Sequence, residues 1–410
     1  MSYINCARCI SCGQEIEALP QLTLCPHCGG LLDVVYDYPR ISARFNRGVL
    51  ANRVRRDMWR YAELLPVEQA PAGGLAVGDT PLYDMPRLAE EIGIAKLYIK
   101  DEGLNPTASM KDRASAMAVV KALEGGYDVI ACSSTGNAAS SLAGNAAAAG
   151  LKTYIFVPER APQGKLTQLL LYGARVFAVR GDYQQTFRLS AEAIEQYGWY
   201  NRNAAINPYL LEGKKTVALE IAEQLQWQVP DYVAVAVGDG CTIAGVYKGF
   251  ADLLAVGIID RIPRLLAVQA EGCCPINTAY REQRPLEAQP ENTLADSIAV
   301  GWPRNPDKAL AAIRDSRGLT IEVSDEQILA AMRLLGRSCG IFGEPAGVAA
   351  LAGLVKARQQ QLIPADATVV HIVTGNGLKD IANGIKAVGQ PHYVEPKLKA
   401  VQDILDSIDT

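Results

Sequence analysis

The sequence has no marked excess of charge of either sign and no long hydrophobic run. Its 410 residues include 40 lysines and arginines and 44 aspartates and glutamates, giving a formal net charge of -4. Without a basic field, nucleic acid is not expected as the main partner. Apolar runs such as Tyr232–Val237 have the length of a core strand and are too short to span a membrane. We therefore expect no membrane association.

The beginning of the sequence lacks a basic region followed by an apolar run, which is the pattern of a secretory signal. We therefore predict a cytoplasmic protein. Nearly half of the residues are hydrophobic, as in ordinary globular proteins. A chain of 410 residues is too long for one small core, so we expect two or more structural units.

Five of the ten cysteines lie within the first 28 residues. Cys9 and Cys12 form one Cys-x2-Cys turn, and Cys25 and Cys28 form a second. Each such turn directs two thiolates to one point, and zinc prefers four ligands in a tetrahedron. The pattern predicts a zinc ribbon with a structural metal. Cys6 and Cys9 form a further Cys-x2-Cys pair, so the sequence leaves open which pair binds the metal. The alternative to a zinc site is a set of reduced thiols without metal.

Beyond residue 80, apolar strands alternate with amphipathic segments of helical length. Strands are predicted over residues 96–100, 128–132, 153–157, 175–179, 232–237, 265–269 and 368–373, and helices over 137–149 and 162–172. A short terminal helix is expected between 391 and 410. Strands that alternate with helices predict parallel sheets covered on both faces.

Four short segments stand where a strand ends and a helix begins. They are 105–113 with Lys111, 133–137, 238–242 and 374–377. Ligands bind at the carboxyl ends of parallel strands, and a glycine-rich turn before a helix offers N–H groups to a phosphate. Each segment alone is weak evidence, because surface lysines and glycine turns are common. Together, one lysine, one asparagine turn, one glycine-rich loop and one Thr-Gly turn are enough to hold pyridoxal phosphate.

The stretch Lys100-Asp-Glu-Gly-Leu-Asn-Pro-Thr-Ala-Ser-Met-Lys-Asp-Arg113 resembles the lysine motif of fold-type II pyridoxal phosphate enzymes, most closely the threonine synthases. Further matches follow in the same order: Ser134-Thr-Gly-Asn137, Phe156-Val-Pro, Gly164-Lys-Leu, Asn207-Pro208, Leu211-Glu-Gly-Lys-Lys-Thr, Gln269-Ala-Glu-Gly, Glu344-Pro-Ala and Thr374-Gly-Asn-Gly-Leu-Lys-Asp. The cysteine pairs, which end in Cys28-Gly-Gly-Leu-Leu-Asp-Val, are also similar to those of many threonine synthases. The resemblance covers almost the whole chain.

The resemblance implies a role for each of these segments. Lys111 would be the catalytic residue, binding the cofactor covalently and later moving protons. Asn137 would bond the cofactor's phenolic oxygen, and Thr374 its pyridine nitrogen. The phosphate would lie among Gly238, Asp239, Gly240, Cys241 and Thr242, and the substrate would contact Thr107, Ser109, Ser134 and Thr135.

The family fold is α/β, with two parallel-sheet domains. We expect a zinc ribbon over residues 1–36, an extended wrapping arm over 37–78, a large cofactor-binding domain over 79–117 and 206–410, and a small mobile domain over 118–205. The implied reaction converts O-phosphohomoserine and water to L-threonine and phosphate, and the family suggests a homodimer. The alternatives are a β-eliminating or β-replacing relative (threonine or serine dehydratase, ammonia-lyase or cysteate synthase) and a non-catalytic homologue that acts as a binding protein.

The sequence departs from the family pattern near the substrate. The phosphate loop reads Gly-Asp-Gly-Cys-Thr where Gly-Asn-Ala-Gly-Asn is typical, and we expect Asp239 to point away from an anion and to cap the helix or bind another group. The stretch 295–306 stands where Arg-Ile-Gly-Asn-Pro is usual, and its first part, Ala295-Asp-Ser-Ile-Ala-Val300, is similar to a stretch of serine and threonine dehydratases. Arg304 or Lys165 would have to supply the missing positive charge. These departures concern the substrate side of the site and leave the cofactor prediction unchanged.

Overall fold

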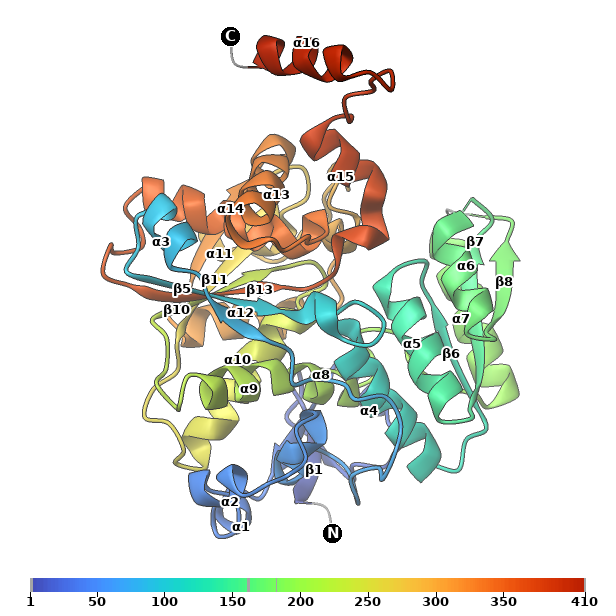
Figure 1. The fold of residues 1–410 in the computed structure, drawn as a ribbon. Helices are drawn as coiled ribbons and strands as arrows, with labels where there is room; N and C mark the ends of the chain where they lie inside the picture. The colour runs from blue at the N-terminus through green and yellow to red at the C-terminus, as the bar shows by residue number, and fades with distance from the viewer. Residues whose placement is uncertain (1–2, 161–162, 182, 409–410) are drawn as a thin grey trace.

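The computed structural model describes residues 3–160, 163–181 and 183–408, which form a large sheet, a smaller sheet and an N-terminal ribbon (Figure 1). The large sheet has six strands in the order β12 (Leu319–Val323), β11 (Arg264–Ala270), β10 (Tyr232–Ala236), β13 (Thr368–Val373), β5 (Lys96–Asp101) and β4 (Leu82–Asp84). Neighbouring strands are parallel except at the edge, where β4 runs antiparallel to β5. The sheet therefore directs the ends of five strands to one edge.

Helices cover both faces of this sheet. Every residue of β10 is buried, as expected for a strand whose two faces are both covered. One face packs on helices α9 (Thr216–Gln224), α10 (Cys241–Ala255) and α12 (Pro306–Asp315). The other face packs on α13 (Asp325–Cys339) and α14 (Pro345–Gln359). Figure 1 shows these two layers on opposite sides of the strands.

The smaller sheet lies beside the large one and contains four parallel strands. Their order is β8 (Arg175–Val179), β7 (Lys152–Pro158), β6 (Val129–Ser133) and β9 (Tyr200–Asn201). Its helices are α4 (Lys111–Glu124), α5 (Asn137–Ala148), α6 (Gln163–Leu171) and α7 (Tyr183–Tyr197). Helix α4 also packs on α8 (Tyr209–Lys214), and it therefore joins the two sheets.

The N-terminal ribbon is an antiparallel sheet in the order β2 (Glu15–Ile16), β1 (Ile4–Cys9) and β3 (Leu32–Tyr36). Asp33 of β3 forms ion pairs with Lys248 of α10 at 2.8 Å and with Lys308 of α12 at 3.1 Å. Lys308 also donates a hydrogen bond of 2.6 Å to the carbonyl of Leu32. The ribbon is thus held by helices that belong to the large sheet.

The arm that follows the ribbon is built from short helices, whereas the sequence analysis expected an extended segment. They are α1 (Tyr38–Ser42), α2 (Arg47–Ala51) and the 3-10 helix η1 (Met58–Leu64). Asp37 and Asn46 begin α1 and α2 by accepting hydrogen bonds from backbone N–H groups. Buried side chains such as Ile41, Phe45 and Trp59 pack into the core under the large sheet. The arm therefore wraps the main body as a series of turns.

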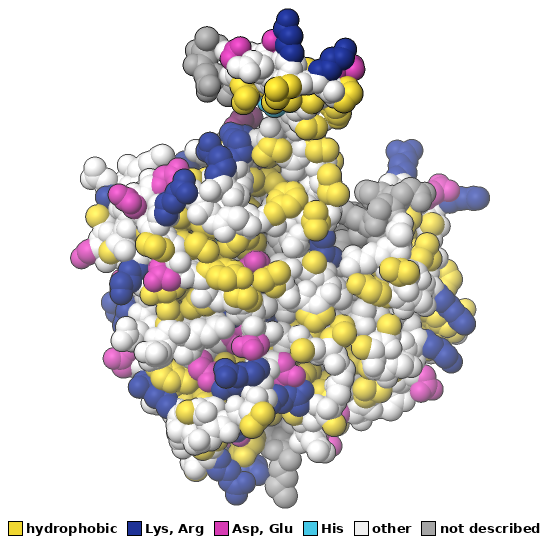
Figure 2. Space-filling model, viewed as in Figure 1, with side chains coloured by type: hydrophobic (Ala, Val, Ile, Leu, Met, Phe, Trp, Pro, Cys, Tyr) yellow, Lys and Arg dark blue, Asp and Glu magenta, His cyan; other side chains and the backbone are white. Residues whose placement is uncertain are grey.

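The remaining elements connect and flank these layers. They are α3 (Pro86–Ile92), η2 (Glu102–Leu104), α11 (Pro275–Glu282), η3 (Asp296–Ile298), η4 (Gly377–Asp380), α15 (Ile381–Val388) and α16 (Leu398–Ile408). Within the described residues, no helix is both long and apolar enough to span a membrane. On the face shown in Figure 2, basic and acidic side chains are interspersed, in keeping with the small net charge.

The predicted strands agree with the observed ones to within one residue at each end. The predicted helix over 137–149 is α5, and the one over 162–172 is α6, although Pro162 lies outside the described residues. The expected terminal helix is α16. The proposed domain boundaries stay predictions, with β6 to β9 all falling between residues 118 and 205.

A buried charge cluster centred on Arg113 joins the segments around the β5–α4 connection. The guanidinium donates two hydrogen bonds of 2.7 Å to Glu102 and bonds of 2.6 and 2.7 Å to Glu220. Lys100 adds an ion pair of 2.7 Å to Glu220. The four side chains are at most 3% exposed, and their charges cancel. Such a cluster holds its geometry tightly, because removing one partner leaves a buried charge unpaired.

Replacing Arg113 by methionine is therefore expected to lower the free energy of unfolding by about 3–5 kcal/mol. Denaturant unfolding followed by circular dichroism measures this change. Arg281→Met is the control, because the Arg281–Glu322 ion pair is half-exposed and its loss should change stability little. Equal stability losses in the two variants would contradict a structural role for the Arg113 cluster.

Candidate active site

Three of the four predicted segments meet at one edge of the large sheet. They follow β5, β13 and β10, which are consecutive neighbours in that sheet. The β5 connection leads to Lys111, the β13 connection begins with Thr374, and the β10 connection contains residues 238–242. Because parallel strands end at the same edge, segments far apart in the chain become adjacent.

The loop that carries Lys111 is fastened to the Thr374 turn. The N–H of Met110 donates to the carbonyl of Thr374 at 2.9 Å, and the N–H of Asn376 donates to the carbonyl of Ala108 at 3.1 Å. Ser109 and Gly375 form a β-bridge between these bonds. Ala108 has φ of 65°, a left-handed conformation that is strained for a residue with a Cβ. These contacts place the start of α4 beside the turn after β13.

Asp112 fixes the same loop from inside. Its carboxylate accepts hydrogen bonds of 2.8 Å from both the N–H and the hydroxyl of Thr107, and one of 2.7 Å from Asn145 on α5. Burial raises the pKa of Asp112 to about 6, although these hydrogen bonds oppose the shift. Thr107 is only 1% exposed and its hydroxyl is committed to Asp112. Its assignment to the substrate stays a prediction that this geometry does not favour.

The residues before α10 form a tight turn. Gly240 has φ of 85°, and a Cβ there would lie 2.6 Å from the carbonyl oxygen of Asn305. At Gly238 an added Cβ would lie 3.1 Å from the Cα of Ile298. No described side chain caps α10, so its first N–H groups stay available to an anion.

Asp239 does not cap α10, contrary to one of the alternatives offered by the sequence. Its carboxylate accepts a hydrogen bond of 3.2 Å from the N–H of Arg304, and its carbonyl accepts one of 3.1 Å from the N–H of Asn305. The second alternative, that Asp239 binds another group, is the one observed. The acidic side chain is thus directed to the segment after η3.

Asn137, the first residue of α5, reaches the same site from the smaller sheet. Its amide nitrogen donates to both oxygens of Glu344, at 2.8 and 3.1 Å. Glu344 precedes α14, and its N–H bonds the carbonyl of Gly375 at 3.0 Å. A Cβ on Gly375 would lie 2.3 Å from the Glu344 carboxylate, so a larger residue there would displace that carboxylate. Glu344 was visible in the Glu-Pro-Ala motif, but the sequence suggested no role for it.

The other residues predicted to bind substrate lie near these turns. Ser134 accepts a hydrogen bond of 3.2 Å from the N–H of Gly136, and both Ser134 and Thr135 are half-buried. Ser109 is fully buried, and its hydroxyl has no hydrogen-bond partner among the described residues. Arg304 lies with its guanidinium 4.0 Å from the ring centre of Phe187 on α7. The Lys165 side chain lies outside the described residues.

Lys111 has an amine that loses its proton more easily than usual. Burial is the main cause, and the positive charges of Lys214 and Arg202 add to it, while Cys241 and Glu344 oppose it. Together they lower the pKa of Lys111 to about 8. A neutral amine is the form that attacks a carbonyl carbon. Lys214 was visible in the Leu211-Glu-Gly-Lys-Lys-Thr motif, and Arg202 lay in no motif. The sequence suggested no role for either, because their effect depends on packing across the chain.

These observations fit pyridoxal phosphate. An amine with a lowered pKa suits the aldehyde of this cofactor, and an uncapped helix N-terminus behind a glycine turn suits its phosphate. The glycine at 240 leaves the backbone close to the segment after η3, with no space for a side chain. Lys111, Asn137, Thr374 and residues 238–242 are therefore the candidates for holding it.

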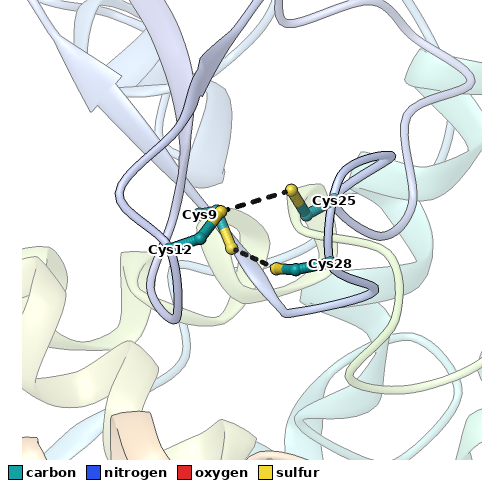
Figure 3. A group of neighbouring side chains, drawn as sticks. All are labelled: Cys9, Cys12, Cys25 and Cys28. Carbon is teal, nitrogen blue, oxygen red and sulfur yellow. Dashed lines mark hydrogen bonds between the residues drawn. The ribbon is translucent and has the colours of Figure 1, made fainter.

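The four cysteines of the two knuckles form a second candidate site (Figure 3). The Cys9 and Cys28 sulfurs are 3.5 Å apart, and those of Cys12 and Cys25 are 3.8 Å apart. All four lie within 4.8 Å of one another, and Cys6 is not part of the group. Cys6 instead pairs with Val35 along the β1–β3 ladder. The sequence left open whether Cys9 pairs with Cys6 or with Cys12 in the first knuckle, and the geometry favours Cys12.

Comparison with known proteins identifies the family. A model of the family "Pyridoxal-phosphate dependent enzyme" matches residues 74–375. The threonine synthase of Methanosarcina acetivorans is 42% identical over 97% of this chain and 98% of its own length. This chain belongs to the threonine synthase family of pyridoxal-phosphate dependent enzymes. The family includes the threonine synthase of Methanocaldococcus jannaschii, which is 40% identical over 98% of this chain and 99% of its own.

Solved structures support the fold-type II architecture. The diaminopropionate ammonia lyase of Escherichia coli superposes with a TM-score of 0.68 at 20% identity, covering 84% of this chain and 92% of its own. A threonine deaminase isoform of Solanum lycopersicum gives a TM-score of 0.65 at 21% identity, covering 75% and 87%. At these identities the likeness concerns the fold alone.

The lowered pKa of Lys111 can be measured without cofactor. In competitive acetylation of the apoprotein followed by mass spectrometry, labelling of Lys111 is expected to reach half of its maximum near pH 8. The neutral amine is the reactive form, so labelling rises with pH through that value. A short lysine peptide, whose amine has a pKa of about 10.4, is the reference. Identical profiles for Lys111 and the peptide would contradict the proposed environment of Lys111.

Proposed function

We propose that this member of the threonine synthase family converts O-phosphohomoserine and water to L-threonine and phosphate. The observation that carries the proposal is Lys111, an amine with a lowered pKa held by backbone bonds against the Thr374 turn. Near-full-length similarity to threonine synthases supports the choice of reaction. The substrate is a small phosphorylated amino acid, consistent with the positive charge of Arg202 near Lys111.

Bound pyridoxal phosphate supplies the electron sink that stabilises negative charge on the carbon atoms of the substrate. Lys111 would hold the cofactor and then, as a free amine, take the proton from the substrate's α-carbon and return protons later. Glu344 orients the amide of Asn137 by accepting its two hydrogen bonds. The neutral hydroxyl of Thr374 would form a hydrogen bond with the pyridine nitrogen of the cofactor.

Contacts between the two sheets position these groups. The ammonium of Lys379, in η4, donates to the hydroxyl of Ser140 at 2.9 Å and to Gln168 at 3.3 Å. Ser140 and Gln168 belong to α5 and α6, which cover the smaller sheet. Together with the bond from Asn137 to Glu344, these contacts hold the smaller sheet against the Thr374 side of the site. Such contacts align the reacting groups and exclude water.

The test is to supply O-phosphohomoserine to the holoenzyme and to measure phosphate and amino acids together. Equal amounts of phosphate and threonine are expected. A keto acid with ammonia would instead indicate a β-eliminating relative, and no turnover despite bound cofactor would leave a binding protein. Lys111→Ala should lower kcat by at least about a thousandfold. Lys356→Ala is the control, and near-normal turnover by Lys111→Ala would contradict the assignment.

We also propose that Cys9, Cys12, Cys25 and Cys28 bind one structural zinc ion. Four sulfurs within 4.8 Å of one another support it, because four thiolates close a tetrahedral site without leaving an open position. Hydrogen bonds from backbone N–H groups, of which that of Cys12 is the strongest, lower the pKa of Cys9 to about 6 and favour the thiolate that binds metal.

Elemental analysis of the purified protein should find about one zinc per chain. Cys12→Ser with Cys28→Ser should lose it, whereas Cys339→Ser, outside the group, should keep it. Chelation is expected to lower the melting temperature, because metal binding contributes to folding. Wild-type protein that contains no zinc and has freely titratable thiols would contradict the site.

We further propose a cytoplasmic homodimer, as the family resemblance suggests. The even mixture of surface charges supports a protein that works away from nucleic acid. Light scattering would decide the oligomeric state, since one chain has a mass of 44.0 kDa.

A further inference from the structure

Lys214 is a buried lysine without a counter-ion. It is the last residue of α8 and only 4% exposed, and its ammonium has no hydrogen bond or ion pair with any described residue. Its neighbour Lys215 is fully buried but is paired with Glu212 and, at 2.6 Å, with Asp252. An unpaired buried charge is costly, so it is retained where an anion will meet it.

The position of Lys214 beside α10 indicates which anion it would bind. A Cβ placed on Gly245 would lie 3.1 Å from the Cβ of Lys214, so α8 and α10 touch at this point. Gly245 follows Cys241, the first residue of α10, by four residues, a rise of about 6 Å. The Lys214 charge is the strongest of those that lower the pKa of Cys241, and it also lowers that of Lys111. The ammonium is thus close to both the helix N-terminus and the reactive amine.

A second unpartnered group lies at the start of α10. Asn305 is 2% exposed, and its amide nitrogen has no hydrogen-bond partner among the described residues. Asn305, Cys241 and Lys308 line one cavity at the start of α10. Lys308 is already bonded to Asp33 and Leu32 of the ribbon. Among these groups, Lys214 and Asn305 are the ones whose donors stay available.

We propose that Lys214 binds a phosphate dianion at the N-terminus of α10, and that this phosphate belongs to the cofactor. The inference rests on the proposed function in taking the cofactor to be pyridoxal phosphate. The loop over 238–242 carries an acidic residue that turns to Arg304, so a lysine from α8 supplies the positive charge that this loop lacks. The predicted cradle did not include a residue from α8.

A substrate phosphate has the same chemistry, and ligand binding by the apoprotein separates the two sources. Wild type, Lys214→Gln and Lys214→Arg would be titrated with pyridoxal phosphate and with pyridoxal, which lacks the phosphate. Lys214→Gln is expected to lower the affinity for pyridoxal phosphate by about tenfold to a hundredfold, which is the effect of losing a charge-assisted hydrogen bond. Pyridoxal affinity should change much less, and Lys214→Arg should keep most of the preference for phosphate.

Two controls keep the test independent of folding. Lys308→Gln removes a lysine that lines the cavity at the start of α10 but is paired with Asp33, so the ratio of the two affinities should stay that of wild type. In addition, Lys214→Met should raise the melting temperature of the apoprotein, because it removes an unpaired buried charge. Adding pyridoxal phosphate should then raise the melting temperature of this variant less than that of wild type.

If Lys214→Gln lowers the affinities for pyridoxal phosphate and pyridoxal by the same factor, the proposal is overturned. The lysine would then act only on Lys111 or on packing. Unchanged cofactor affinity with a raised KM for the phosphorylated substrate would overturn it as well and assign Lys214 to the substrate. Neither result depends on threonine formation. A protein that binds the cofactor through Lys214 but makes no threonine would refute the proposed reaction and leave this inference standing.

Discussion

The guanidinium of Arg113 is the contact on which the geometry of the site depends. It lies two residues after Lys111 and is bonded on both sides to carboxylates, Glu102 before the loop and Glu220 on α9. Because both pairs are buried and two-pronged, α4 cannot rotate or slide without breaking several charged hydrogen bonds. Asp112 then shapes the short loop in front, and the bonds to the Thr374 turn follow from that shape. The reactive lysine is placed by its neighbours in sequence.

The sheets and the loops at their edges could be predicted from the sequence. Apolar runs such as Tyr232–Ala236 and Thr368–Val373 are buried on both faces, and that burial leaves a local pattern that is easy to recognise. Lys111 was predictable for a similar reason, since its motif is continuous in the chain. The arm over 37–78 was less predictable, because its short helices are stabilised by packing against the core rather than by any period of their own.

The electrostatic parts of the site could not be predicted in the same way. Glu344 meets Asn137 across about half the length of the chain, and the effect of Lys214 depends on how α8 lies against α10. Nothing local distinguishes Lys214 from Lys215, although one is neutralised and the other is not. The contact of Asp239 was equally hard to predict, because its partner is the backbone of Arg304 and any residue except proline could provide that N–H.

The ion pairs of Asp33 bear on where the catalytic body of this protein begins. The family match starts at residue 74 and therefore leaves out the ribbon. Yet Lys248 and Lys308, which lie on helices next to the cofactor loop, are both paired with Asp33 of the ribbon. A chain shortened to the matched region would keep every proposed cofactor residue. Lys248 would keep its second ion pair, at 3.1 Å to Glu212, whereas Lys308 would lose both the carboxylate of Asp33 and the carbonyl of Leu32. The ribbon thus contributes directly to the charge balance beside the cofactor loop.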